Sequence, residues 1–201
     1  MRLIPASAYR RMPWKNGGGE TVEIAVSPES ATLNDFAWRL SMARVEAPGP
    51  FSLFPGVDRT LALLEGQALV LNVDGRIATL TPDSAPLTFP ADVPTHAELP
   101  EGGITDLNVM SRRGQAAHSA YRKVVDAPES LTCEGDDTFL LVRTGAVAVR
   151  ADGSELTVRS GETLHMAAST GRVIEVVPHD TAVLYVVSFR PWSVFRSGGP
   201  G

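Results

Sequence analysis

A pattern of short strands and turn residues occurs twice in this chain. In the first copy, Gly66 interrupts apolar residues and Asp74-Gly75 follows a strand-like run. In the second copy, Gly145 and Asp152-Gly153 hold the same places, offset by 79 (145 − 66) and 78 (152 − 74) residues. An Asp-Gly pair between two apolar runs is typical of a two-residue β-hairpin. The near-constant offset favours a duplicated β unit, although any two unrelated hairpins would share these short-range signals.

Other segments alternate between apolar and polar residues with the period of a β-strand. In residues 36–45, aromatic and aliphatic side chains share one face, whereas Arg39 and Ser41 lie on the other. Residues 106–110 alternate in the same way, with Asp106 and Asn108 on one face. Residues 115–133 are mixed and polar, and we interpret them as a connector between two halves. Many short strands with turn signals predict an all-β barrel or sandwich.

Composition excludes several classes of protein. The chain has 201 residues and a net charge of −5, without a basic cluster, so we expect no nucleic-acid partner. No apolar run approaches the roughly 18 residues of a membrane span, and residues 1–14 lack the apolar stretch of a signal peptide. The single cysteine, Cys133, cannot form an internal disulfide. Together these features predict a cytoplasmic protein with no membrane partner.

A glycine-rich motif near the start is the densest functional signal. Trp14, Lys15 and Asn16 precede three successive glycines, Gly17 to Gly19. Glycines let a backbone approach a ligand closely, and successive N–H groups can bind an anion. The alternative is a flexible surface loop. The order of residues does not match a phosphate-binding P-loop.

Several long motifs give the chain a family resemblance. These motifs are Trp14–Gly19, Glu23–Ala25, Phe36, Trp38–Ser41, Gly49–Ser52, Phe54–Gly56, Asp58-Arg59, Leu64, Gly66 and Asp106–Met110. In these segments the chain resembles the HutD/Ves family, which is named for its association with histidine utilisation in bacteria. The resemblance is strong over residues 1–114 and looser beyond.

The resemblance implies a fold but no reaction. It predicts a cupin-like double β-barrel, a bicupin of the jelly-roll type. We expect an N-terminal half over residues 1–114 and a C-terminal half over residues 115–201, packed as one compact unit. By analogy with cupin-like barrels, which often pair, the chain is a candidate to form a homodimer. No established catalytic activity accompanies the family.

Comparison with metal-binding cupins argues against a metal. Those proteins resemble one another in a His-x-His, Glu and Gly pattern. Aligning that glycine with Gly66 places Arg59 at the glutamate position and Ser52 and Phe54 at the histidine positions. A later cupin histidine falls near Leu87. Because borderline and softer metals need imidazole, thiolate or carboxylate ligands, we expect no metal and no cofactor, and a metal-dependent oxygenase is disfavoured.

The same comparison suggests a pocket for an organic anion. Arg59 offers a forked donor array suited to a carboxylate, and Arg39 is a candidate second cation. The alternatives are a structural salt bridge of Arg59 with Asp58 or Asp106, and a solvated face for Arg39. For Glu23 we favour a structural ion pair. The candidate ligand-binding residues are Asn16, Arg39, Ser41, Ser52, Phe54, Arg59, Asp106 and Asn108.

Two functions fit this hypothesis. The first is a metal-independent protein that binds a small organic anion of histidine breakdown, such as urocanate or formylglutamate, and senses or modulates the pathway. The alternative is a metal-independent isomerase or hydrolase acting on the same class of ligand. Its acid or base would be Glu23 or Asp106. The four histidines, His96, His118, His165 and His179, lack metal-ligand spacing and are interpreted as structural or exposed.

Overall fold

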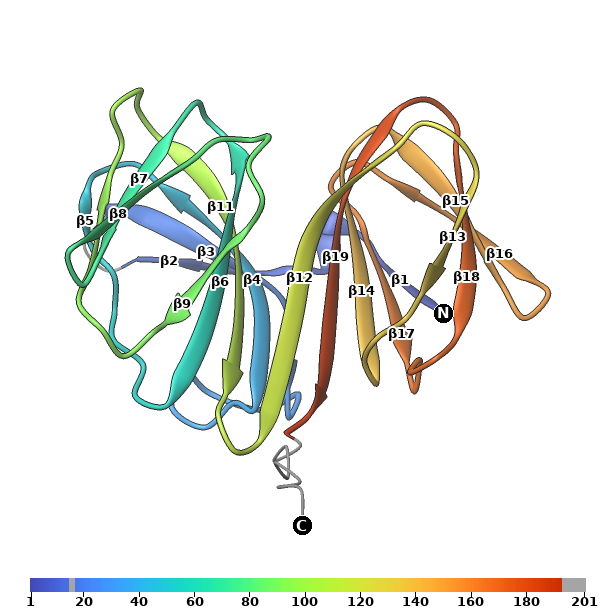
Figure 1. Cartoon of the computed structure of the whole chain (residues 1–201), viewed down its shortest axis with the longest axis horizontal. Coiled ribbons are helices and arrows are strands. Elements are labelled where there is room, and N and C mark those ends of the chain that lie inside the picture. Colours follow the sequence, from blue (N-terminus) through green and yellow to red (C-terminus); the bar gives the residue numbers. More distant parts are fainter. Residues whose placement is uncertain (15–16, 193–201) are drawn as a thin grey trace, which may run out of the picture.

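The computed structural model describes residues 1–14 and 17–192 and shows two lobes side by side, each built from two facing β-sheets (Figure 1). One short 3-10 helix, η1 (Ala6–Ala8), lies near the start. No helix in the described ranges has the length and apolar character needed to cross a membrane. The first lobe contains β2 (Arg10–Pro13), β3 (Gly19–Ser27), β4 (Trp38–Val45), β5 (Gly49–Pro50), β6 (Val57–Glu65), β7 (Leu69–Val73), β8 (Arg76–Leu80), β9 (Leu87–Pro90), β10 (Thr95–Glu98) and β11 (Ile104–Arg112).

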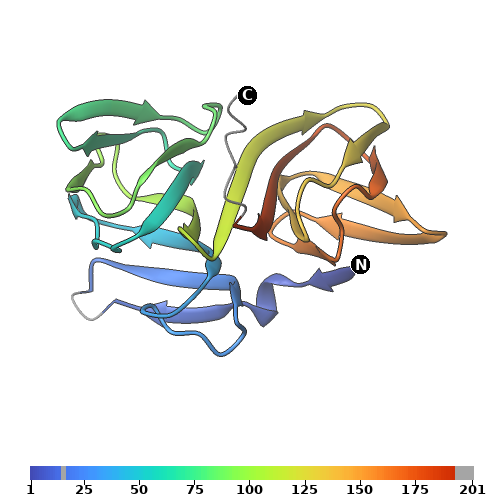
Figure 2. The ribbon, with the colours of Figure 1, turned by 60° about the horizontal axis from the view of Figure 1, so that its bottom comes forward.

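The second lobe continues after the turn at Gly114, the predicted boundary between halves. It contains β12 (Ala116–Val125), β13 (Glu129–Thr132), β14 (Asp137–Thr144), β15 (Ala146–Ala151), β16 (Ser154–Arg159), β17 (Thr163–Ala167), β18 (Val173–Pro178) and β19 (Ala182–Pro191). The first strand of the chain, β1 (Arg2–Ile4), also lies here, because it pairs with β17. Figure 2 shows this N-terminal strand extending away from the first lobe toward the second.

The strand order confirms the duplicated β unit. The first lobe has sheets in the order β2-β3-β4-β11-β6-β9 and β5-β10-β7-β8. The second has β1-β17-β14-β19-β12 and β13-β18-β15-β16. The series from β4 to β11 therefore returns, in the same arrangement, as β12 to β19. Both Asp-Gly turns join the expected strands, and positive φ at Asp74 (49°) and Asp152 (50°) matches the hairpin turn that these dipeptides favour.

The all-β, cupin-type prediction holds, but the word barrel needs correction. Each sheet has free edges in its strand order, so hydrogen bonds do not close either lobe into a barrel. The short β5, of two residues, pairs only with β10, and β9 is the outer strand of its sheet. Each lobe is better described as a jelly-roll sandwich of two sheets.

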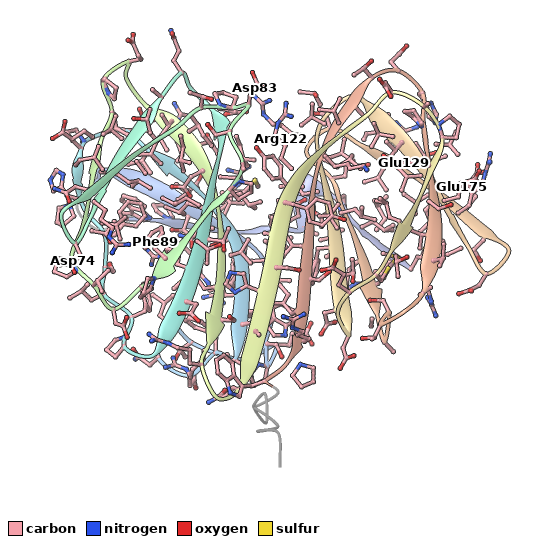
Figure 3. The ribbon with its side chains drawn as sticks, viewed as in Figure 1. Asp74, Asp83, Phe89, Arg122, Glu129 and Glu175 are labelled. Carbon is pink, nitrogen blue, oxygen red and sulfur yellow. The ribbon has the colours of Figure 1, made fainter. Side chains whose placement is uncertain are left out.

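The predicted connector over residues 115–133 is wrong. These residues form β12 and β13, and β12 runs along the boundary between the lobes. Its polar side chains find partners across that boundary. His118 shares hydrogen bonds with Thr60 (2.8 Å) and Ser111 (2.7 Å) of the first lobe. Arg122 pairs with Asp83 at 2.7 Å (Figure 3). Residues 116–125 do not alternate between apolar and polar side chains, so no local pattern indicated a strand there.

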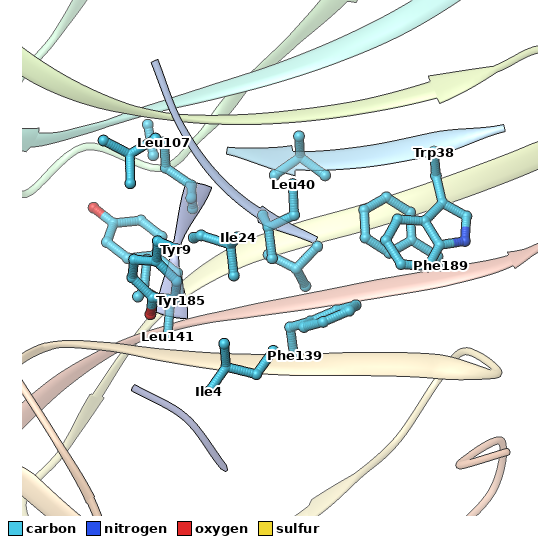
Figure 4. Packing of buried hydrophobic residues seen from close by; sticks show 14 of the residues in the cluster. Ile4, Tyr9, Ile24, Trp38, Leu40, Leu107, Phe139, Leu141, Tyr185 and Phe189 are labelled. Atoms are coloured by element: carbon cyan, nitrogen blue, oxygen red, sulfur yellow. The ribbon is translucent and has the colours of Figure 1, made fainter. Parts of the chain in front are cut away.

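The apolar face of β4 packs against the second lobe. Trp38 stacks on Phe189 of β19, with ring centroids 4.3 Å apart and planes 11° from parallel (Figure 4). Leu40 and Leu107 belong to the same buried cluster. Because successive strand residues point to opposite faces, this contact directs the polar residues of β4 and β11 toward the interior of the first lobe.

Candidate functional site

The interior of the first lobe contains a cavity of about 790 Å³. Its walls include the inner faces of β4, β6 and β11 and the loop over residues 47–56. All predicted ligand-binding residues except Asn16 line it: Arg39, Ser41, Ser52, Phe54, Arg59, Asp106 and Asn108. Asn16 lies outside the described residues. The structure thus brings together side chains from distant parts of the chain, and their binding role stays a prediction.

Arg39 is buried and forms an ion pair within the protein. Its side chain is not on a solvated face, as the alternative held, because its relative exposure is 6%. Its Nε donates to Oε2 of Glu23 at 2.7 Å. Glu23 also lies 3.6 Å from Arg10, so its predicted role as a structural ion-pair partner is confirmed. Most of the charge of Arg39 is therefore compensated within the protein.

Arg59 is the contrasting arginine. It is 3% exposed, and its guanidinium lies over the rings of Phe51 and Phe54, at 5.0 and 5.3 Å from their centroids. Within the described part of the chain, its Nη2 donates a long hydrogen bond, 4.0 Å, to the sulfur of Met110, and its Nε has no hydrogen-bond partner. Burial lowers the pKa of Arg59 to about 10, with Asp106 opposing and Arg39 adding to the shift. The group therefore remains a cation at neutral pH.

The structural salt bridge proposed as an alternative for Arg59 is wrong. Across residues 1–14 and 17–192, Arg59 has no carboxylate oxygen within 4.0 Å. Asp58 pairs instead with Arg113, whose Nε lies 3.5 Å from its Oδ1. Asp106 lines the same cavity as Arg59 but does not contact it. A buried guanidinium whose Nε–H lacks a partner is suited to an external anion.

Asp106 is the most unusual group in the cavity. It is 1% exposed, and neither carboxylate oxygen accepts a hydrogen bond of normal geometry from residues 1–14 or 17–192. Burial raises its pKa to about 7, while the charge of Arg59 and the backbone N–H of Ala43 oppose the rise. The buried Oδ1 of Asn108, two residues along β11, also has no hydrogen-bond partner in these ranges. Such a cluster of unsatisfied groups is rare in folded proteins and marks a site of strain or function.

The second lobe shows that the fold does not need these polar groups. The register places Asp106 opposite Leu63 and Asn108 opposite Leu61. The equivalent pairs in the second lobe are Leu184 with Val142 and Val186 with Leu140. All four of these second-lobe residues belong to a buried apolar cluster. The same architecture is thus filled with hydrocarbon in one lobe and carries a polar cavity in the other.

The residues of the cavity do not suit the metal of cupin enzymes. Ser52, Phe54 and Arg59 line it, and a permanent cation repels a metal ion. Asp106 is the one carboxylate among the described residues that line this cavity. No group of three or more His, Cys, Asp or Glu side chains within the described ranges could hold a metal ion. We therefore derive no chemistry through a metal.

Part of the glycine-rich motif lines the cavity, but one of its glycines packs tightly against a neighbouring strand. Trp14 and Gly18 line the cavity, and Lys15 lies with Asn16 outside the described residues. Gly19 faces the neighbouring strand so closely that an added Cβ would lie 2.2 Å from the carbonyl oxygen of Arg44. This contact explains one of the three glycines by packing rather than by ligand binding.

Replacing Gly19 by alanine is expected to destabilise the fold by roughly 1–3 kcal/mol, the usual range for overpacking. The Cβ would force β3 away from β4, because the atom that it meets is backbone. Urea denaturation followed by circular dichroism measures the effect. Gly49→Ala is the matched control, since a Cβ there meets nothing within 4 Å. Equal midpoints for the two variants would contradict the packing role of Gly19.

Sequence reasoning missed one contributor to the site. Phe51 lies beneath the guanidinium of Arg59, whereas the sequence marks the Gly49–Ser52 segment only as part of the family resemblance. His118 is not among the residues that line the cavity; it is half-buried at the boundary between the lobes, and burial lowers its pKa to about 4. Its hydrogen bonds with Thr60 of β6 and Ser111 of β11 agree with its interpretation as a structural histidine. His165 is likewise held by Asp137, at 2.7 Å.

These features define a two-lobed protein of the cupin fold whose first lobe holds an arginine-bearing polar cavity. Comparison with solved structures supports the fold: oxalate decarboxylase from Bacillus subtilis superposes with a TM-score of 0.68 at 10% identity, covering 96% of this chain and 78% of that one. The chain belongs to the HutD family, whose match extends over residues 6–184.

Relatives at higher identity agree with this assignment. HutD from Pseudomonas fluorescens is 27% identical, with a TM-score of 0.80 and coverage of 96% of this chain and 99% of that one. A 21.2 kDa protein from the hutC 3′ region of Pseudomonas putida is 40% identical over 78% of this chain and 80% of its own. Protein Ves from Citrobacter koseri is 43% identical over 52% of this chain. The match covers only 56% of that relative's length.

Proposed function

We propose that the cavity of the first lobe binds a small organic carboxylate linked to histidine utilisation, with Arg59 as its anion-binding group. The observation that carries the proposal is the contrast between the two arginines. Glu23 compensates Arg39, whereas Arg59 has an unpartnered Nε and no ion pair among the described residues. A buried cation of this kind gains strong charge-assisted hydrogen bonds from a carboxylate.

The family supplies the context. A relative lies in the hutC region of P. putida, and the family is that of HutD. Intermediates of histidine breakdown are small carboxylates, and we propose urocanate or formylglutamate as ligands. A cavity of about 790 Å³ has the size of common small-molecule sites. In this proposal the protein senses or modulates the level of the intermediate.

Calorimetric titration tests the proposal. We expect one of urocanate, formylglutamate, formiminoglutamate, glutamate and formate to bind with a Kd on the order of micromolar, about −8 kcal/mol. Formate belongs in the set because it is the simplest carboxylate and because HutD from P. fluorescens has been solved in a formate condition. Imidazole, a fragment of urocanate without a carboxylate, is the control. Heat from imidazole alone, or from none of these compounds, would contradict an anion-binding pocket.

Asp106 favours a second candidate function, acid–base catalysis on the same ligands. Its carboxyl group lines the cavity, and burial raises its pKa to about 7. A group with such a pKa can both hold and release a proton near neutrality. Proton NMR of the bound compound during long incubation separates the two functions. A new product that forms with the natural protein and fails to form with Asp106→Asn would favour the enzyme.

A further inference from the structure

Among the residues that the structure describes, buried hydrogen-bond donors and acceptors of the cavity both lack partners. Nε of Arg59 is a donor, whereas both oxygens of Asp106 and Oδ1 of Asn108 are acceptors. A buried polar atom without a partner costs about 1–3 kcal/mol. A plain carboxylate would satisfy the guanidinium but offer nothing to the three acceptor atoms. A ligand that satisfies this cavity must therefore also donate hydrogen bonds to the acceptor atoms at a second position.

The two kinds of group occupy different levels of the sheet. Arg59 on β6 lies opposite Met110 of β11. Asn108 and Asp106 lie two and four residues back along β11, on the same face as Met110. At a rise of about 3.3 Å per residue, their Cα atoms are displaced from that level by roughly 7 and 13 Å. The donor and the acceptors thus come from different levels of the sheet, so they can contact different atoms of one small molecule.

The charge of Asp106 limits which chemical group the ligand can carry at its second end. The charge of Arg59 acts on Asp106, whereas Glu23 compensates Arg39. A second carboxylate on the ligand would lie against Asp106 and add a like charge. An N–H group, by contrast, donates to the unpartnered oxygens, and a cationic one also compensates the carboxylate.

We propose that Asp106 and Asn108 form an acceptor subsite for an N–H-bearing end of the ligand. The ligand class is then a small carboxylate that also carries an amine, amide, amidine or azole N–H, as urocanate and formylglutamate do, rather than a monocarboxylate or dicarboxylate without such a group. This inference rests on the proposed carboxylate site at Arg59, and it deepens that proposal. The second lobe supports it, because Leu184 and Val186 take the equivalent positions in a filled apolar interior.

Two matched pairs of acids test the subsite by calorimetry on the full chain. The first pair is 4-aminobutanoate and pentanoate, in which a methyl group replaces the ammonium. The second is 3-(imidazol-4-yl)propanoate and 3-phenylpropanoate. We expect the N–H member of at least one pair to bind at least tenfold more tightly than its partner. Glutarate, a dicarboxylate of similar length, is expected to bind more weakly than 4-aminobutanoate.

Variants assign the preference to the two residues. In Asp106→Leu, the affinity ratio within the pair should fall toward one, and Asn108→Leu should reduce it independently. Circular dichroism confirms that each variant is folded before titration. Equal binding of both members to the natural protein would overturn the subsite and leave the carboxylate site standing. A ratio that persists in both variants would also overturn it. No binding of any acid would overturn the carboxylate site, and the subsite with it.

Discussion

Replacing Arg59 by methionine is expected to weaken carboxylate binding at least 100-fold, which corresponds to about 2.7 kcal/mol. Methionine retains an unbranched apolar stem that can pack on Phe51 and Phe54, but it removes the charge and every N–H donor. Loss of one partner of a buried, hydrogen-bonded charge pair usually costs about 2–5 kcal/mol. Calorimetry with the tightest acid found for the natural protein measures the change.

Two further variants make this result specific. Arg113→Met removes an arginine of the same lobe that pairs with Asp58 and Asp92 and does not line the cavity, so affinity should stay within about twofold, a few tenths of a kcal/mol. Arg59→Lys keeps a cation without the fork, and we expect an intermediate loss. If Arg59→Met bound as tightly as the natural protein, the anion site would have to lie elsewhere.

The sequence allowed the faces of β4 to be separated, but not their directions to be assigned. Alternation correctly grouped Trp38 with Leu40 and Arg39 with Ser41. In an isolated sheet the apolar face would point to the core and the polar face to water. Here a second lobe covers the apolar face, so the polar face of β4 points inward and both are buried. The direction depends on how two lobes pack, which no local pattern encodes.

Local and long-range features differ in how well they could be predicted. The Asp74-Gly75 and Asp152-Gly153 hairpins follow from two residues each, because positive φ at both turn positions suits this pair. The pairing of β1 with β17 joins residues more than 150 positions apart, and nothing in Arg2–Ile4 identifies that partner. The prediction for residues 115–133 failed for the same reason, because the hydrogen-bond partners of His118 on β12 lie in the other lobe.

The sequence indicated which charged residues lie at the cavity, but not which of them are paired with an opposite charge. The resemblance to metal-binding cupins drew attention to Arg59, and the strand pattern added Arg39 and Asp106. Which arginine is compensated depends on β3 placing Glu23 beside Arg39, across a bulge between Glu23 and Ala25. An irregularity of one residue shifts the side chains that follow it to the other face. The sequence therefore suggested the members of the site, but not which of them remains uncompensated.

Replacing Asp106 by leucine is expected to stabilise the protein, by an amount that grows with pH. The pKa of this carboxyl group is about 7 in the folded chain and 3.8 in its ordinary state. Because the folded pKa is the higher one, the folded state holds a proton that the unfolded state has released. Stability is thus lost as pH rises from about 4 to 7, at about 1.36 kcal/mol per pH unit. The total loss of folding stability is about 4 kcal/mol, and it is reached above pH 7.

Urea denaturation at pH 5 and pH 8 measures this effect. The difference in unfolding free energy between Asp106→Leu and the natural protein should be about 3 kcal/mol larger at pH 8, because about two pH units of the titration lie between these conditions. Asp106→Asn should show the same pH dependence, since it also removes the ionisable group while keeping the shape. Asp58→Asn is the control, because Asp58 is half-buried and paired with Arg113.

A difference that did not vary with pH would show that Asp106 keeps an ordinary pKa in the folded chain. The expected gain in stability has a functional meaning. The second lobe contains leucine at the equivalent position, so the fold accepts an apolar residue there. A carboxylate that weakens the folded state, and whose oxygens accept no hydrogen bond of normal geometry from the described residues, is best explained by a partner that arrives with the ligand. Stabilisation of Asp106→Leu together with loss of its preference for N–H-bearing acids would connect the two properties in one residue.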